Sequence, residues 1–147
     1  NGDSLEINGP HGEFVLNENS NHSLTFVAWH TGFAPIRSLV EHAMALDVAE
    51  TINLIWITAC DEDRYLDNLC RSWNDALDNF TYTTITADLN NTDIETIVSG
   101  IIDQIDELDA NDIYVAGNTA LLDNCTNVLQ QKQFNLAQLK LDLITHA

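Results

Sequence analysis

Short apolar runs of strand type alternate with helical stripes along most of the chain, and this alternation constrains the fold more than any other feature. The first two runs are largely apolar and the second is rich in β-branched residues, as in strands buried on both faces of a sheet, and the third has a β-favouring Thr-Tyr-Thr-Thr sequence. The runs span residues 24–28, 52–57, 80–85, 113–115 and 139–144. Between them, apolar residues recur at helical spacing over 35–46, 66–77, 94–108 and 121–129.

This order of elements predicts an α/β fold. Strands that alternate with helices form a parallel sheet, and right-handed crossovers place helices on both of its faces. We therefore expect a doubly wound, five-stranded parallel sheet over residues 23–147.

The opening segment does not follow the alternation. Residues 5–7 and 13–16 have strand character, the Gly-Pro-His-Gly turn separates them, and residues 17–22 form a polar linker. We expect residues 1–22 to be a short β remnant, the end of a preceding β-rich module and its linker. Because the chain begins with Asn1 and not Met, we also expect it to be a piece of a longer protein.

The charge excludes several classes of partner. The chain has 23 acidic residues against 5 Lys and Arg, a net charge of -18. Such a surface repels nucleic-acid phosphates and anionic lipid, and no apolar run approaches the roughly 20 residues of a membrane span. We expect most acids to lie on solvated faces, with Arg64 and Arg71 as solvated helix residues that pair with them.

The cysteines point to a reducing compartment. Cys60, Cys70 and Cys125 are odd in number, lie in apolar stretches and show no CxxC spacing. Buried free thiols in a cytoplasmic protein are therefore expected. No His, Cys and carboxylate set has the spacing of metal ligands, so no metal site is expected.

The predicted fold selects three loops for chemistry. Ligands of open parallel sheets bind beyond the carboxyl ends of the strands. The loops that follow the first, second and fourth predicted strands cover residues 29–35, 58–63 and 116–119.

At these loops the chain resembles the NAD(P)-binding domain of the ferredoxin reductase superfamily. Residues 28–38, read with 114–117, are similar to the family's Ala-Gly-Gly-Thr-Gly-x-Ala-Pro loop and its Cys-Gly or Ala-Gly pair. NAD(P)H-flavin reductases and the reductase components of bacterial oxygenases are the branch it resembles most. Residues 6–16 resemble the last strands of the flavin-binding barrel that precedes this domain in the family.

The resemblance implies the positions of a cofactor site. The first loop and its helix N-terminus would hold the cofactor pyrophosphate, with Arg37 as the nearby cation, and the last loop would place the nicotinamide against a flavin. FAD would be held by the upstream barrel and is not expected in this fragment, which alone would be inactive. No catalytic side chain is implied. The implied cofactor-binding residues are Thr31, Gly32, Phe33, Pro35, Asp61, Ala116, Gly117 and Asn118.

The chain departs from the family pattern in the first and last loops. Trp29 and His30 replace two glycines, and their side chains either fill the pyrophosphate space or contact a phosphate and stack on a ring. Ala116 replaces the usual family cysteine and favours the flavin reductase branch.

The second loop carries three consecutive acids. Asp61, Glu62 and Asp63 stand where NADP-preferring members present a cation. Carboxylates would repel a 2′-phosphate and accept a ribose hydroxyl, which favours NADH over NADPH. The other interpretation is that these acids only cap the following helix.

Two functions follow. The first is the pyridine-nucleotide domain of a flavin-dependent oxidoreductase, which passes hydride from NADH to FAD on an upstream barrel. Electrons would then reach free flavin, an iron–sulfur domain or an oxygenase. The alternative is a degenerate domain that binds no dinucleotide and serves docking or assembly, which Trp29 and His30 favour.

Overall fold

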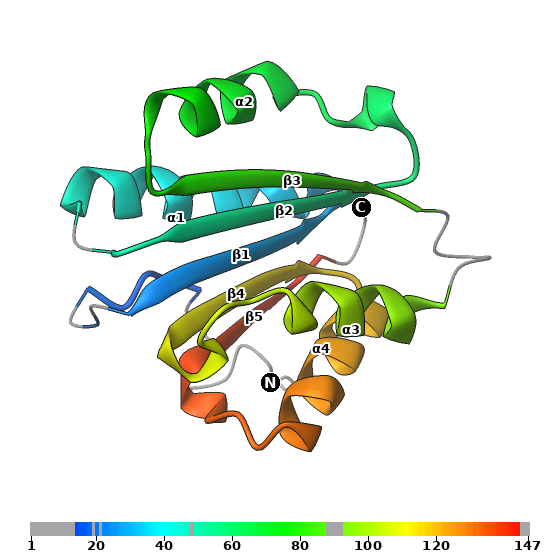
Figure 1. Cartoon of the computed structure of the whole chain (residues 1–147). Helices are drawn as coiled ribbons and strands as arrows, with labels where there is room; N and C mark the ends of the chain where they lie inside the picture. The colour runs from blue at the N-terminus through cyan, green and yellow to red at the C-terminus, as the bar shows by residue number, and fades with distance from the viewer. Residues whose placement is uncertain (1–13, 19, 21, 48, 88–92, 145–147) are drawn as a thin grey trace.

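The computed structural model describes residues 14–18, 20, 22–47, 49–87 and 93–144, and it contains the predicted five-stranded sheet (Figure 1). Every neighbouring pair of strands is parallel, and the order is β3-β2-β1-β4-β5. The predicted fold class is therefore confirmed. The strands are β1 Ser23–Trp29, β2 Ile52–Thr58, β3 Phe80–Thr86, β4 Asn111–Gly117 and β5 Leu139–Leu143.

Helices cover both faces of the sheet, as Figure 1 shows. The pair α1 and α2 packs on one face, and the pair α3 and α4 packs on the other. The helices are α1 Phe33–Leu46, α2 Asp67–Ala76, α3 Ile94–Asp103 and α4 Thr119–Gln131. Short 3-10 turns, named in chain order, are η1 His30–Gly32, η2 Asp61–Asp63, η3 Leu108–Ala110 and η4 Leu136–Gln138.

Two apolar cores result from the alternation of side chains along the strands. Phe26, Trp56 and Tyr114 are buried on the α1 and α2 face. Val27 and Val115 are buried on the α3 and α4 face. The central strands are buried on both faces, so their sequences are largely apolar. This pattern allowed them to be predicted from the sequence.

The third helix ends earlier than its apolar stripe predicted. The stripe extends to Leu108, but α3 ends at Asp103. Glu107 has a left-handed backbone (φ 52°), and its carbonyl accepts a hydrogen bond from the Asn111 side chain. Ile105 and Leu108 therefore pack against the core from a turn, where an apolar residue gives the same sequence signal as on a helix.

Part of the predicted β remnant lies outside the described residues. Its first strand and the following turn cannot be compared, and the described residues 14–18 contain no strand. The strand predicted at residues 13–16 is therefore wrong over residues 14–16. The Phe14 ring instead packs edge-on against Tyr114, and the Asn17 N–H donates to the Tyr114 hydroxyl at 3.0 Å. These residues cover part of β4, a position that a helix could have filled.

The cysteines follow the prediction in two cases out of three. Cys70 and Cys125 are buried free thiols, and burial raises the pKa of each to about 12. Cys60 is also free but exposed, so its predicted burial is wrong. The reason is that β2 ends at Thr58, which places Cys60 beyond the sheet. Among the described residues, no helix is long and apolar enough to cross a membrane.

Candidate dinucleotide site

The three predicted loops meet at one edge of the sheet. β1 lies between β2 and β4, in register with both, so the carboxyl ends of these three strands are adjacent. The predicted segments 29–35, 58–63 and 116–119 lie at these ends, since β1 ends at Trp29, β2 at Thr58 and β4 at Gly117. The strand order therefore brings together three segments that the sequence analysis could identify only one by one.

In the first loop a histidine occupies a glycine-like backbone position. His30 has φ 54°, in the left-handed region that side chains rarely adopt. Its carbonyl accepts a hydrogen bond of 3.0 Å from the Trp56 indole N–H. Phe33 stacks on the same indole, with ring centroids 4.0 Å apart. A residue of the neighbouring strand thus fixes the shape of this loop.

The first and last loops pack directly against each other. A Cβ on Gly32 would lie 2.9 Å from the carbonyl carbon of Ala116 and closer still to its oxygen. A Cβ on Gly117 would lie 2.9 Å from that of Trp29. Both glycines are buried. Their lack of a side chain is thus required by contact between the loops, whether or not a cofactor approaches.

The amino end of α1 carries no acidic side chain and follows η1 directly, with the Phe33 N–H bonded to the carbonyls of His30 and Thr31. The helix begins at Phe33, its N-cap is Gly32, and no side chain caps it. No acidic residue lies in its first turn, so the partial positive charge of the helix end is not neutralised there. Thr31 is exposed just before this end. Arg37, one turn further on, is paired with Glu41 at 3.2 Å.

The other predicted residues of the first and last loops are buried or half-buried. Phe33 is fully buried and its N–H bonds to the His30 and Thr31 carbonyls, so its side chain supports the loop from within the core. Pro35 is half-buried in the first turn of α1, and Ala116 is buried. Asn118 is the N-cap of α4, and its side chain accepts a hydrogen bond of 2.9 Å from the Leu121 N–H.

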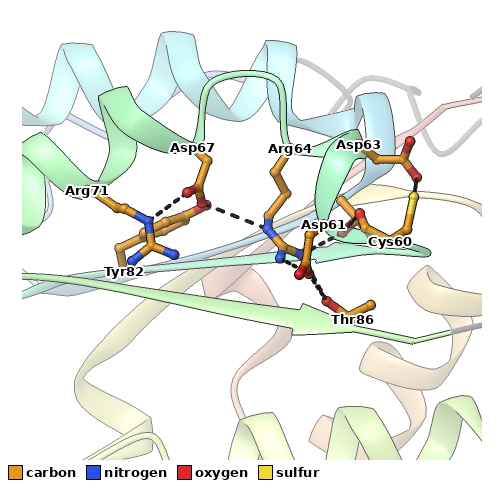
Figure 2. A network of polar contacts seen from close by, with 9 residues as sticks. Cys60, Asp61, Asp63, Arg64, Asp67, Arg71, Tyr82 and Thr86 are labelled. Atoms are coloured by element: carbon orange, nitrogen blue, oxygen red, sulfur yellow. Dashed lines mark hydrogen bonds and ion pairs between the residues drawn. The ribbon is translucent and has the colours of Figure 1, made fainter.

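The second loop is organised around Arg64 (Figure 2). Its guanidinium lies 2.5 Å from Asp61 Oδ1 and donates to the hydroxyls of Thr58 at 2.6 Å and Thr86 at 3.2 Å. Asp67 Oδ1 lies 3.8 Å from its Nε. The Arg64 side chain is only 7% exposed, so the prediction that it is solvated is wrong.

Arg64 is the residue of this site that sequence reasoning missed. Its partners Thr86 and Asp61 come from different elements, and only the pairing of β2 with β3 brings them together. The hydrogen bond from Thr86 and the Arg64 guanidinium hold the pKa of Asp61 below its usual value. Asp61 is therefore a carboxylate at neutral pH, bound to a cation on one side and 79% exposed.

The acids of this loop do not cap the following helix. Residues 61–63 form their own turn, η2, and α2 begins at Asp67 without a side-chain cap. The capping interpretation is therefore wrong. Arg71 is exposed and donates to Asp67 at 2.6 Å, so its predicted solvated pairing is confirmed.

Asp67 predicts a dependence of stability on pH. Burial raises its pKa, but hydrogen bonds from Arg71 and Tyr82 outweigh this and leave the pKa lowered. Its stabilising contribution is therefore present above the unfolded pKa of about 4 and lost as the pH falls through the lower folded value. We expect the stability lost on Asp67→Asn to shrink between pH 6 and pH ~3, measured by urea unfolding.

The control for this prediction is Asp123→Asn, which changes an exposed carboxylate on α4. Its effect on stability should not depend on pH in the same range. An equal loss for Asp67→Asn at both pH values would contradict the role of the Asp67 charge.

A further contact joins the first and second loops. The Cys60 thiol donates to Asp63 Oδ2 at 3.3 Å, and His30 Nε2 lies 3.6 Å from the same oxygen. The hydrogen bond to Asp63 raises the pKa of Cys60. Among the described residues, no group of three or more His, Cys, Asp or Glu side chains is placed to hold a metal ion.

Solved structures that share this fold include reductases. The chain matches a ferredoxin NADP+ reductase from Neisseria gonorrhoeae with bound FAD and NADP, with a TM-score of 0.68 and 13% identity. The match covers 84% of this chain and 56% of that one. Amycolatopsis cytochrome P450 reductase GcoB gives a TM-score of 0.71 at 12% identity, over 90% and 41%. At these identities the likeness shows the fold.

Sequence relatives include reductase components. Protein RfbI of Salmonella typhimurium is 27% identical over 147 residues, 96% of this chain and 43% of its own length. Terephthalate 1,2-dioxygenase reductase component 1 of Comamonas is 34% identical over 90 residues, 61% and 27%. An NAD(P)H-flavin reductase of Aliivibrio fischeri is 34% identical over 55 residues, 37% and 23%. The chain thus spans less than half the length of these relatives.

A family model matches most of the sheet. It is described as the oxidoreductase NAD-binding domain, and it matches residues 26–127, from β1 into α4. The match includes the three loops described above and confirms the resemblance inferred from residues 28–38 and 114–117. The chain belongs to the oxidoreductase NAD-binding domain family.

Proposed function

We propose that the chain is the pyridine-nucleotide domain of a flavin-dependent oxidoreductase that passes hydride from NADH to FAD. The observation that carries this proposal is the direct packing of Gly32 against Ala116. It places the amino end of α1 beside the loop that follows β4, so one dinucleotide can span both. NADH would supply a hydride, which is two electrons and a proton, to the flavin.

The pyrophosphate would lie at the amino end of α1. Unpaired N–H groups of a first helical turn and the helix dipole stabilise phosphate. Thr31 adds an exposed hydroxyl, and the first turn holds no carboxylate that would oppose the phosphate charge. The nicotinamide end would lie along Ala116, Gly117 and Asn118, where β4 ends in two small residues and Asn118 begins the turn into α4.

The second loop supports NADH over NADPH. A 2′-phosphate needs a cation, and the cation at this position, Arg64, is bound to Asp61 and lies near Asp67. Asp61 is 79% exposed and can still accept a hydrogen bond from a ribose hydroxyl. A phosphate at the same place would meet the negative charge of Asp61 before it met Arg64.

The partners follow from the same proposal. FAD would be bound by an upstream barrel, with residues 1–22 as the end of that module and its linker to the domain at 23–147. The named relatives include a dioxygenase reductase component and a flavin reductase. A redox protein or free flavin is therefore the acceptor we propose. The free thiols fit a cytoplasmic location.

Titration of this chain with NADH and with NADPH tests the proposal. We expect saturable NADH binding by calorimetry, with backbone NMR shifts at Thr31, Ala34 and Asn118, and weaker binding of NADPH. Absence of saturation at about 1 mM NADH, which corresponds to roughly -4 kcal/mol of binding free energy, would overturn the proposal and favour the docking alternative.

A double variant separates the two interpretations of Trp29 and His30. If these side chains fill the pyrophosphate space, Trp29→Gly with His30→Gly should bind NADH at least about tenfold tighter, or ~1.4 kcal/mol. We expect a change below about threefold, because the His30 backbone already has the glycine-like conformation and Trp29 packs against the core under α3 and α4.

A further inference from the structure

Tyr65 is a large aromatic residue that stays exposed beside the proposed dinucleotide site. It lies between η2 and α2, in the segment that follows β2, and it is 57% exposed. In the described part of the chain, the other exposed large apolar residues are Val15, which precedes β1, and Leu136 in η4. Tyrosine is enriched at binding surfaces because its ring offers a large rigid contact area. Tyr65 is therefore a candidate contact for a ligand of this site.

Two buried rings hold the Tyr65 ring in position. Phe33 and Trp56 are fully buried and stacked on each other. The Tyr65 ring stands nearly perpendicular to both, with its centroid 6.1 Å from that of Phe33 and 5.4 Å from that of Trp56. Edge-to-face contacts of this kind are favourable. They orient the ring from the core side and leave more than half of the residue accessible.

The two rings beneath Tyr65 also belong to the loops of the proposed site. Phe33 is the first residue of α1, whose amino end is the proposed position of the pyrophosphate. Trp56 donates its indole N–H to the His30 carbonyl in the first loop. Tyr65 therefore lies at the boundary between the first and second loops, beside the end of α1.

The charge of the second loop indicates which part of a dinucleotide would lie near Tyr65. Three acids at residues 61–63 precede it, and the Asp61 side chain is 79% exposed. Arg64 is only 7% exposed and is already paired with Asp61. Phosphate is disfavoured beside these carboxylates, whereas a ribose and a base carry no charge. An exposed aromatic ring in these surroundings suits the flat face of a neutral base.

We propose that Tyr65 is the stacking surface for the adenine base of the dinucleotide. This inference rests on the proposed function, because it takes the pyrophosphate to lie at the amino end of α1. The adenine would lie on the exposed area of the Tyr65 ring, with its ribose beside Asp61. The nicotinamide half would extend the other way, to the loop after β4. Tyr65 would therefore contribute to the affinity for the adenosine half of the cofactor and not to that for the nicotinamide half.

Calorimetric titration with NADH and with reduced nicotinamide mononucleotide, which lacks the adenosine half, tests the proposal. We expect Tyr65→Leu to weaken NADH binding about tenfold, because leucine covers the buried rings but offers no aromatic face. Binding of the mononucleotide should change by less than about threefold. Tyr65→Phe keeps the ring and should stay within about threefold of the wild type for NADH. Leu136→Ala is the matched control, since it truncates another exposed apolar side chain just before the amino end of β5.

NMR gives a signature that a merely structural role of Tyr65 would not produce. The ring current of a stacked aromatic side chain moves the adenine H2 and H8 resonances upfield. We expect this shift for NADH bound to the wild type and to Tyr65→Phe, and its loss in Tyr65→Leu. Nuclear Overhauser contacts between the Tyr65 ring and the adenine protons in the wild type provide the same test without any substitution.

The outcomes separate this inference from the proposed function. NADH binding by the wild type without adenine contacts to Tyr65, or with equal affinity in Tyr65→Leu, would overturn the inference alone. Equal weakening of NADH and the mononucleotide in Tyr65→Leu would overturn it too, because Tyr65 would then support the loops and not the base. Absence of NADH binding by the wild type would overturn the proposed function and this inference together.

Discussion

Replacement of Asp61 by alanine is expected to shift cofactor preference toward NADPH by about tenfold or more, equivalent to roughly 1.4 kcal/mol. The substitution removes the carboxylate that lies 2.5 Å from the Arg64 guanidinium. It also removes a negative charge from the place where a 2′-phosphate would lie. Arg64 would keep its hydrogen bonds to Thr58 and Thr86, which hold it at the ends of β2 and β3. Calorimetric titration with NADH and NADPH gives the ratio directly.

Two further variants make this prediction specific. Glu62→Ala removes the neighbouring exposed carboxylate, which has no ion pair in the described part of the chain, and should change the ratio by less than about threefold. Asp61→Ala combined with Arg64→Ala should lose the gain in NADPH binding. A gain of equal size in the double variant would show that Arg64 plays no part in it, even if NADH binding itself is confirmed.

Replacement of Gly32 by alanine is expected to destabilise the chain by about 3 kcal/mol, at the upper end of the cost of overpacking. The new Cβ would overlap the carbonyl group of Ala116. The Cβ is fixed by the backbone of residue 32 and the carbonyl belongs to the backbone of β4, so no side-chain rotation can relieve the overlap. The first loop would have to separate from the end of β4. Urea unfolding measures the change in free energy of unfolding.

Gly100→Ala is the matched control. Gly100 lies inside α3, and a Cβ there would meet nothing within 4 Å. Because alanine favours a helix interior over glycine, this variant should gain about 0.5–1 kcal/mol. If Gly32→Ala also retained full stability, the packing of the two loops would not be needed for the fold. The proposed juxtaposition of phosphate and nicotinamide ends would then lose its main support.

The sheet could be predicted because its signal is local. Each strand and each amphipathic helix repeats its pattern within a window of about a dozen residues, and the parallel order follows from their alternation. The end of α3 could not be predicted, since Ile105 and Leu108 reach the core from a turn. Apolar spacing alone does not distinguish the two cases.

The site was predicted in position but not in detail. The predicted segments 29–35, 58–63 and 116–119 are adjacent because of the strand order, and the alternation predicted the parallel sheet at whose edge they lie. The burial of Arg64 depends on Thr86, which is 22 residues away on another strand. The burial of Phe33 depends likewise on stacking with Trp56 of β2. Contacts of this range leave no trace in spacing or composition.

The hydrogen bond from the Trp56 indole to the His30 carbonyl is relevant to how the phosphate-loop sequence can differ between such domains. The glycines of a phosphate-binding loop are usually regarded as the residues that determine the shape of the loop. Here Gly32 is retained, a histidine occupies the left-handed backbone position, and a hydrogen bond from β2 holds the carbonyl of that histidine. Recognition of remote members by glycine pattern alone would therefore pass over chains of this kind. An aromatic hydrogen-bond donor on the adjacent strand is the feature to seek in its place.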